Sequence, residues 1–582
     1  MLAGARAVLL AYQDGYFRAG FDSLGLTSFA RHYGQGFAGA LAALLLVRVL
    51  ASKSNALVRG ALGILTIAGG YAFVSCQFPE FAYHKPRFES PVEVAAHVLC
   101  AIMALIATLT LFIAPLRRSK LSFGLAWTAV VLGILLVPVA AFTRAEPAAW
   151  PQRPNVILIS LDTLRTDHLS CYGYERNTSP QIDRFAQAGT RFTSAHAPHP
   201  WTLTSHMSML TGLLPSEHGV EQEKRLASSV PTLAELYEEA GYNTLALLDP
   251  VIWLDQRYGF DRGFASYRRV RGSAEQKIAL LDNVFDDLGD APFFLFLHYF
   301  DAHSDVQDLP YESAPSDFDE LCDWYDGQFT GCSDEGICAS KFLIAANNGE
   351  VVIDEATERF ILDLYDAGIA TLDRRLGALF HELEERGLFE NSIVVLTSDH
   401  GEEFREHGAY LHGTHYQECI SVPLIIRSPN QVESRVSDVL VSHVDLAATL
   451  LQLCGLDASK VGGRSYAPLI SRGIDTKRRN HVFFDAASGE LGVRQGDWKL
   501  IHDRREVFLF NLAEDPNETR NLIEVEPAPK QLAELQGLIE AELERLRLRA
   551  EAAELEAGQR RDMNLSEDEL QELGNIGYAG DD

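Results

Sequence analysis

The chain has no excess of basic residues, and this sets it apart from proteins that bind nucleic acids. Among its 582 residues, 50 are Lys or Arg and 80 are Asp or Glu, so the formal net charge is −30. A phosphate backbone is bound by a basic surface, so we expect no nucleic-acid partner. Residues 1–150 nevertheless carry 12 basic and 6 acidic side chains, and the whole acid excess lies after them.

Cysteine is also scarce, with eight residues in the whole chain. That number is too small for a fold held together by disulfides. Three cysteines lie close together in an acidic insertion at residues 305–351: Cys322, Cys332 and Cys338. In an oxidising compartment we expect two of them to pair, and the alternative is three reduced thiols in a surface loop.

The N-terminus lacks the pattern of a cleaved signal, because no short apolar core leads to a small-residue cleavage site. We expect residues 1–31 to lie at a membrane surface. Four apolar spans follow, each close to the ~20 residues that cross a bilayer as a helix: about 35–51, 56–76, 92–116 and 122–143. Residues 1–150 are therefore predicted to form an all-α region with about four transmembrane helices in a lipid bilayer.

Positive charges in the short loops predict the orientation of these spans. Basic residues gather in the first and third loops, around Lys53 and at Arg117, Arg118 and Lys120. By the positive-inside rule both loops are cytoplasmic. We expect a multi-pass cell-membrane protein whose later residues all lie on the extracytoplasmic (periplasmic or outer) side.

After residue 151 the pattern changes to short apolar strands alternating with amphipathic helices, which indicates an α/β fold with a mostly parallel sheet. Expected strands are Val156–Leu161, Thr244–Leu248, Phe293–His298, Ile393–Thr397 and Leu424–Ile426; expected helices include 179–188, 231–240, 355–386 and 446–453. The segments 151–480 read as one catalytic domain. Residues 481–582 read as a small antiparallel sheet, a charged helix at 528–557 and a short tail helix.

Side chains suited to metal binding follow several of the predicted strands. Ligands in open α/β sheets gather beyond the carboxyl ends of strands. The candidates are Asp162, Asp301 with His303, Asp399 with His400, and His412. Alone, each such Asp is more often a turn residue and each such His a packed one. Their convergence on one sheet edge would suit a divalent cation.

A hydroxyl group is predicted beside these ligands. Thr202 precedes an apolar run that reads as a helix. A strand-end carboxylate and a helix-start hydroxyl are what a metal-assisted attack on a phosphate or sulfate ester requires.

These segments together resemble the sulfatase branch of the alkaline phosphatase superfamily. The resemblance rests on ordered motifs: NVILISLDT, TSPQIDRFAQAGTRF, FLHYFDAH, TSDHGEEF, VPLIIR, GVRQGDWKL and LFNLAEDPNETRNL. It implies an alkaline-phosphatase-like sheet with a small C-terminal sheet subdomain. It also implies one divalent ion (Zn, Mn, Mg or Ca) bound by Asp162, Asp399, His400 and the oxygen of Thr202.

The chain departs from formylglycine sulfatases at the nucleophile. Their Cys-x-Pro-Ser-Arg segment, with Cys or Ser first, aligns with Thr202-Leu-Thr-Ser-His206. Threonine is not converted to formylglycine, so we expect a Thr202 alkoxide and a covalent Thr202 ester instead. His303 and His412 would contact substrate oxygens or protonate the leaving group. With Asp301, they could instead hold a second metal.

Three functions remain open from the sequence. The first is a hydrolase of phosphate or sulfate esters, acting on an anionic substrate such as a lipid head group or a glycan. The second is a transferase of phosphoethanolamine or phosphoglycerol type, which the four apolar spans and the threonine favour. The third is a catalytically silent relative that binds or senses glycans, and the presence of Thr202 and Asp399-His400 argues against it.

Overall fold

The computed structural model describes residues 153–288, 291–304, 309–311, 313–325, 340–473, 480–485, 491–502, 506–525 and 529–556. The four predicted membrane spans, residues 1–31, Cys332, Cys338 and the tail helix after Ser566 lie outside this part of the chain. Within it, no helix is long and apolar enough to cross a bilayer. Cys322 is a buried, free thiol.

An eight-stranded mixed sheet forms the centre of the fold, in the order β11-β2-β10-β7-β1-β6-β4-β5. Strand β1 (Asn155–Leu161) lies in the middle, parallel to β6 (Phe293–Tyr299) and β7 (Ser392–Thr397). Both faces of β1 are buried, as its continuous apolar run predicts. On the far side of β6, the parallel strands β4 (Asn243–Leu248) and β5 (Ser266–Arg269) complete one half of the sheet.

The other half of the sheet contains the only antiparallel pairings within it. Strand β10 (Leu424–Arg427) runs antiparallel to both β7 and β2 (Thr190–Phe192), and β11 (Arg435–Ser437) pairs parallel with β2. The five strands expected from the sequence are all present, each within one residue at either end. Strands β2, β5 and β11 were not predicted, since three or four residues with few apolar side chains carry little periodic signal.

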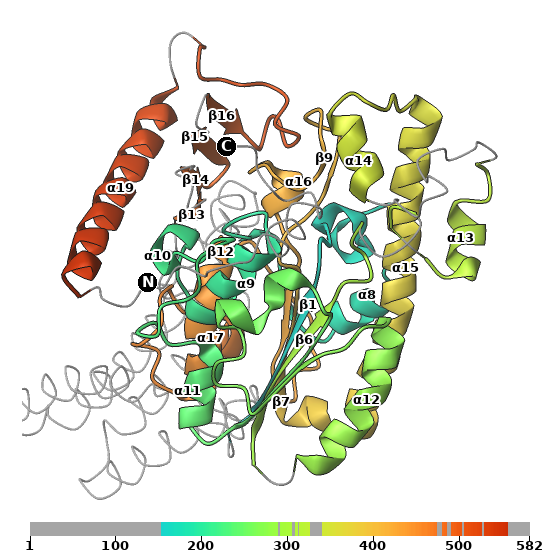
Figure 1. The fold of residues 1–582 in the computed structure, drawn as a ribbon, viewed down its shortest axis with the longest axis vertical. Helices are drawn as coiled ribbons and strands as arrows, with labels where there is room; N and C mark the ends of the chain where they lie inside the picture. The colour runs from blue at the N-terminus through green and yellow to red at the C-terminus, as the bar shows by residue number, and fades with distance from the viewer. Residues whose placement is uncertain are drawn as a thin grey trace, which may run out of the picture. The chain divides into compact units, whose positions relative to one another are not determined.

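Helices cover both faces of the sheet (Figure 1). One face packs against α9 (Thr202–Thr211), α11 (Leu233–Glu239) and α17 (Leu446–Leu453), and the other against α8 (Pro180–Ala186), α12 (Ala274–Asp287) and α15 (Glu355–Glu385). Two apolar cores result, one on each side. This architecture confirms the predicted α/β fold and places the carboxyl ends of β1, β6 and β7 at one edge.

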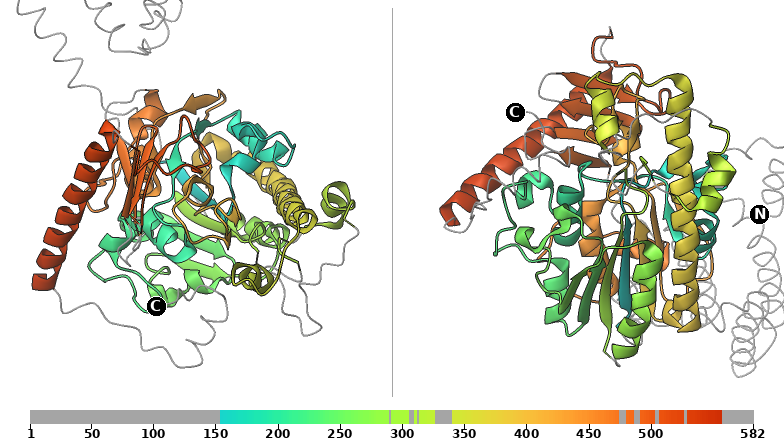
Figure 2. Two further views of the ribbon diagram at one scale, coloured as in Figure 1. Left: turned by 90° about the horizontal axis from the view of Figure 1, so that it is seen from above. Right: turned by 45° about the vertical axis from the view of Figure 1, so that its right-hand side comes forward.

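A second, four-stranded antiparallel sheet follows near the C-terminus, as predicted. Its strands are in the order β13-β14-β15-β16: His481–Asp485, Leu491–Gln495, Trp498–His502 and Val507–Asn511. The charged helix α19 (Lys530–Glu556) lies along this sheet (Figure 2) and buries Leu535 and Ile539 against it. Glu217, in the short helix α10 (Pro215–His218) after α9, pairs with Arg545 of α19 at 2.8 Å.

The chain between β7 and β10 forms two short elements, and the second of them packs against the small sheet. The hairpin of β8 (Glu403–Phe404) and β9 (Tyr410–Leu411) follows β7, and helix α16 (Gln417–Ile420) follows the hairpin. The insertion expected at 305–351 contains α13 (Pro315–Leu321) and α14 (Ser340–Asn347). The segment from β8 to α16 thus lies between the edge that carries the candidate ligands and the C-terminal sheet.

Candidate active site

Asp162 lies directly after β1, at the carboxyl end of the central strand. Its backbone N–H donates to the Tyr299 carbonyl at the end of β6, and its side chain is fully buried. One carboxylate oxygen, Oδ2, accepts from His298 Nε2 at 3.0 Å, whereas Oδ1 makes no hydrogen bond. Burial, reinforced by the charge of Asp399, raises the pKa of Asp162 well above its usual value.

Asp399 and His400 follow β7, the neighbour of β1 in the sheet. Asp399 Oδ1 accepts from the backbone N–H of His400 at 2.9 Å and of Thr163 at 3.3 Å, while Oδ2 makes no hydrogen bond. His400 Nδ1 lies 2.9 Å from the Gly401 carbonyl, which can only accept, so Nδ1 carries the proton. The lone pair of His400 is therefore on Nε2, which lies 3.4 Å from Asp399 Oδ2.

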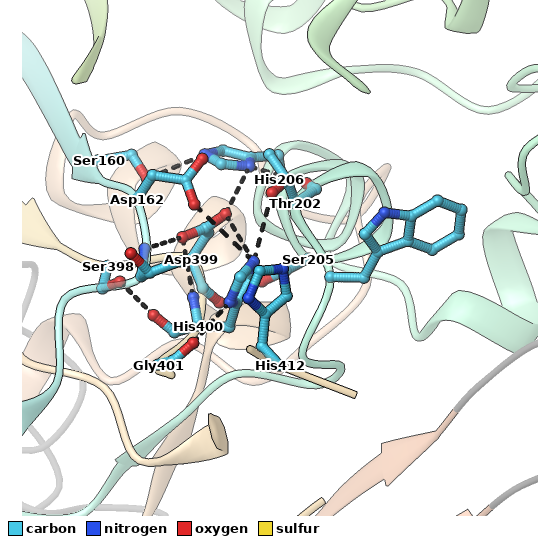
Figure 3. Close-up of polar contacts among 12 residues, drawn as sticks. Ser160, Asp162, Thr202, Ser205, His206, Ser398, Asp399, His400, Gly401 and His412 are labelled. Atoms are coloured by element: carbon cyan, nitrogen blue, oxygen red, sulfur yellow. Dashed lines mark hydrogen bonds and ion pairs between the residues drawn. The ribbon is translucent and has the colours of Figure 1, made fainter. Parts of the chain in front are cut away.

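Thr202 is the first residue of α9 and is buried against these groups (Figure 3). Its hydroxyl oxygen lies 3.3 Å from His400 Nε2. The preceding residue, Trp201, gives the helix no side-chain cap, so the first-turn N–H groups remain available to an anion. Ser205, one turn later, donates its hydroxyl to the Asp399 carbonyl at 2.7 Å and ties the start of α9 to the end of β7.

Asp162, Asp399 and His400 each direct a ligand atom to one point, and these atoms all lie within 4.8 Å of one another. Two of them, Asp162 Oδ1 and Asp399 Oδ2, are buried carboxylate oxygens without a hydrogen bond. Such oxygens are costly to bury alone, and a cation would compensate them. The three residues therefore fit the divalent ion that the sequence predicts, and the Thr202 hydroxyl lies beside them.

His206 occupies the position of the arginine in the formylglycine segment, and sequence reasoning assigned it no role. Its Nδ1 donates to the Thr202 carbonyl at 2.8 Å, and its Nε2 accepts from the Ser160 hydroxyl at 2.9 Å. Burial lowers the pKa of His206 to about 4. His206 is thus a neutral imidazole that holds the first turn of α9 against β1. The sequence signal for this role was its position four residues after Thr202, one helical turn along α9.

A row of three imidazoles extends from His400. The rings of His400 and His412 are 4.3 Å apart between centroids, and those of His412 and His303 are 5.4 Å apart. His303 is stacked on Phe300 at 4.0 Å. Glu402, which sequence reasoning missed, is fully buried with Oε1 3.2 Å from His412 Nδ1. The structure therefore places His303 and His412 in one row with His400, whose Nε2 lies beside the Thr202 hydroxyl.

Asp301 has different partners from His303 and His412. Its Oδ1 accepts from Arg375 at 2.5 Å and from the Ala274 N–H at the start of α12, at 3.0 Å. Among the described residues, Asp301, His303 and His412 do not form a cluster with metal-ligand spacing. The contacts of Asp301 are those of a structural carboxylate that holds α12 and α15 to the end of β6.

Two other basic residues near the motifs also have structural contacts. Arg165 donates to Asp167 at 2.7 Å and to Glu406 at 2.6 Å, and so braces the turn after β1 against the β8–β9 hairpin. Lys499, in the GDWKL motif, is fully buried and pairs with Glu518 at 2.7 Å. Lys499 is thus a packed residue of the C-terminal sheet.

Comparison with known proteins agrees with this geometry. The family model described as Sulfatase matches residues 154–456, slightly more than half of the chain, and the one described as N-sulphoglucosamine sulphohydrolase, C-terminal, matches residues 405–549. An N-acetylglucosamine-6-O-sulfatase from Bacteroides thetaiotaomicron is 24% identical, over 70% of this chain and 90% of its own length. A choline-sulfatase from Rhizobium meliloti is 22% identical, over 66% and 85%. The crystal structure of a phosphonate monoester hydrolase from Agrobacterium radiobacter superposes with a TM-score of 0.53 at 20% identity, over 68% and 96%.

Proposed function

Because this chain belongs to the sulfatase family of sulfuric ester hydrolases, we propose that it cleaves a sulfate or phosphate ester through a covalent intermediate on Thr202. The observation that carries the proposal is the position of the Thr202 hydroxyl. It stands at the uncapped start of α9, 3.3 Å from His400 Nε2 and beside two buried carboxylate oxygens that make no hydrogen bond.

Asp162, Asp399 and His400 would hold a divalent ion, and the Thr202 oxygen would complete its ligands. When bound, such an ion supplies positive charge that lowers the pKa of a neighbouring hydroxyl and stabilises an anionic transition state. Neighbouring groups of the chain orient these ligands before an ion binds. The Gly401 carbonyl holds the proton of His400 on Nδ1, and His298 orients Asp162 through its Oδ2.

In the reaction, the Thr202 hydroxyl releases its proton to water, and Oγ forms a bond to the sulfur or phosphorus as the bond from that atom to the bridging ester oxygen breaks. The departing alcohol takes a proton, which His412 or His303 is placed to supply. Water then attacks the Thr202 ester, releases sulfate or phosphate and restores the hydroxyl. The first-turn N–H groups of α9 would stabilise the anionic oxygens throughout.

Threonine distinguishes this site from one that uses a formylglycine hydrate. An aldehyde hydrate can expel the acid by reforming the aldehyde, but a threonine ester has no such route and must be hydrolysed or transferred. His206, neutral and bonded to the Thr202 carbonyl, supplies positioning where an arginine would supply charge. A threonine nucleophile therefore favours substrates that leave an ester which water or an alcohol readily attacks, and phosphate esters are among these substrates.

Sulfated glycan and choline relatives suggest a polar alcohol as the leaving group. The four apolar spans at residues 35–143 favour a membrane-attached protein acting on the extracytoplasmic side, where lipid head groups and envelope glycans are found. The second candidate function is transfer of a phospho-alcohol group from Thr202 to another alcohol instead of water. It is favoured by the same spans together with the threonine nucleophile.

The test is to trap the intermediate in the purified full-length chain. The protein is mixed with p-nitrophenyl sulfate, p-nitrophenyl phosphate or a phosphoethanolamine lipid, quenched in acid and digested for mass spectrometry. A mass increase on Thr202 supports the proposal, and its size separates sulfuryl, phosphoryl and phospho-alcohol groups. Thr204→Ala, two residues along the same helix, should retain activity, whereas Thr202→Ala should lose it. Activity that survives in Thr202→Ala, or an adduct on another residue, would sink the idea.

A further inference from the structure

A second group of metal-type ligands lies between the main sheet and the C-terminal sheet. His407 is in the turn between β8 and β9, Glu418 is in α16, and Glu518 is in the loop after β16. One ligand atom from each lies within 4.8 Å of the other two. Strand β9 and helix α16 are neighbours in Figure 1, and Glu518 contacts α16 by accepting from the Gln417 N–H at 2.6 Å. This group shares no residue with Asp162, Asp399 and His400.

The facing atoms of this group are buried and lack hydrogen bonds. His407 Nε2 and Glu418 Oε1 lie 3.2 Å apart, but neither makes a hydrogen bond. Glu518 Oε1 makes an ion pair with Lys499 at 2.7 Å and no hydrogen bond. The side chains of Glu418 and His407 are only 7% and 11% exposed. Buried polar atoms that face one another without a hydrogen bond are rare in folded proteins unless something binds between them.

Charge around the group is unbalanced in the direction that favours a cation. Glu418 and Glu518 have two further carboxylates close by, Glu403 and Glu406, whose charges act on Glu418 directly or through one another. The neighbouring cations are Arg165, Lys499 and Arg494, and the first two are each already paired with one of these acids. Four acids against three bases leave an excess of negative charge, which a bound cation would offset.

The backbone at Glu518 is also constrained, since its φ of 51° is in the left-handed region that non-glycine residues seldom adopt. The side chain is held inward at some conformational cost.

We propose that His407, Glu418 and Glu518 bind a second divalent cation, of the Zn²⁺ class, at a structural site separate from the nucleophile. One imidazole and two carboxylates are a donor set that Zn²⁺ accepts, and water can fill the remaining position. The ion would tie the β8–β9 hairpin to α16 and to the C-terminal segment. That hairpin begins next to Glu402 and ends next to His412, so the site would stabilise the part of the chain that carries the imidazole row.

Metal stoichiometry and thermal stability test this proposal. The full-length protein is stripped with a chelator, reloaded with Zn²⁺, freed of excess metal and analysed for bound zinc. Glu418→Gln should bind one equivalent fewer than the unmodified chain. Asp399→Asn removes a ligand of the other site, so a Glu418→Gln, Asp399→Asn double variant should lose the equivalents of both. The melting temperature of Asp399→Asn should still rise on adding Zn²⁺, and that of the double variant should not.

Glu514→Gln is the matched control, because it makes the same change in an exposed residue of the loop that carries Glu518. It should bind as much zinc as the unmodified chain. If Glu418→Gln does not fold, His407→Ala gives the same comparison. When loaded with Co²⁺, His407→Ala should then show the visible absorption of one metal site, and the unmodified chain that of two. Equal zinc content and an equal thermal response in Glu418→Gln and Glu514→Gln would overturn the proposal and leave protonated carboxyl groups as the account of the charge.

Discussion

His412 Nδ1 lies 3.2 Å from Glu402 Oε1, and both side chains are completely removed from solvent. Burial raises the pKa of Glu402 to about 8, so at lower pH this pair retains one more proton than a neutral imidazole facing a carboxylate. Whether that proton rests on the carboxyl oxygen or on Nδ1, the other ring nitrogen carries an N–H. The pair is therefore suited to give a proton to a departing alkoxide.

Glu402→Gln removes this extra proton while keeping a hydrogen-bonding partner for His412. We expect kcat to fall about 10- to 100-fold, the range found when the partner of an active-site histidine is lost. The unmodified enzyme should lose activity as pH rises through about 8, because the pair then gives up its proton. A pH profile of kcat/KM should show this limb, and Glu402→Gln should lack it. Identical alkaline limbs would contradict the role of the pair.

The roles of His303 and His412 can be distinguished by varying the leaving group of the substrate. If His412 is the acid, His412→Gln should lose about 10²- to 10⁴-fold with a simple alkyl ester and far less with p-nitrophenyl esters, which need no proton. If His303 contacts the non-bridging oxygens, His303→Gln should lose a similar factor with both. Steady-state kinetics on esters with a series of leaving groups measures how strongly the rate of each variant depends on the pKa of the leaving group. A strong dependence for His303→Gln and a weak one for His412→Gln would reverse the two roles.

Asp301 provides a test of whether a second ion lies beside the nucleophile. Its contacts with Arg375 and the start of α12 are structural, so Asp301→Asn should lower the free energy of unfolding by about 2 kcal/mol. Metal bound per chain should stay the same. Denaturant unfolding and metal analysis of the same preparation decide whether Asp301 is a structural residue or a metal ligand. A loss of bound metal without a loss of stability would restore Asp301 as a ligand.

Asp485 should make stability depend on pH. It lies at the end of β13, accepts from the Ser216 N–H, and has a pKa that burial raises to about 7. A carboxyl group whose pKa is higher in the folded chain binds more protons there than in the unfolded chain. Stability should therefore fall as pH rises from about 4 to about 7 and then level off.

Asp485→Asn removes that dependence while keeping the acceptor for Ser216. The variant should melt at a higher temperature than the unmodified chain at pH 8, by roughly 5 °C, and at nearly the same temperature at pH 4.5. Asp438→Asn, on an exposed carboxylate, is the control and should leave both values unchanged. A difference at pH 4.5 as large as that at pH 8 would contradict the assignment.

Much of this architecture could be predicted from local patterns. The buried strands before Asp162 and Asp399 are continuous apolar runs, and α15 and α17 have clear helical periodicity, so their limits were predicted within one residue. The residues that form hydrogen bonds to the site residues could not be predicted in this way. Glu402 contacts His412 across the β8–β9 hairpin, and His298 contacts Asp162 from the neighbouring strand; neither spacing is a recognisable sequence signal. Asp301 shows the reverse case, since its position after a strand fits a ligand but Arg375, from a distant helix, holds it.

Strand β1 is the first strand of the central sheet to be synthesised, and it pairs only with β6 and β7, which are encoded far downstream. At ordinary rates of translation, the chain from residue 155 to residue 397 takes roughly ten to fifty seconds to emerge. For roughly the first half of that interval the sequence NVILISL lacks β6, and until the end of it the sequence lacks β7. An unpaired apolar strand is a site of aggregation, so a nascent chain of this protein should depend on a chaperone until the Asp399 segment has been made.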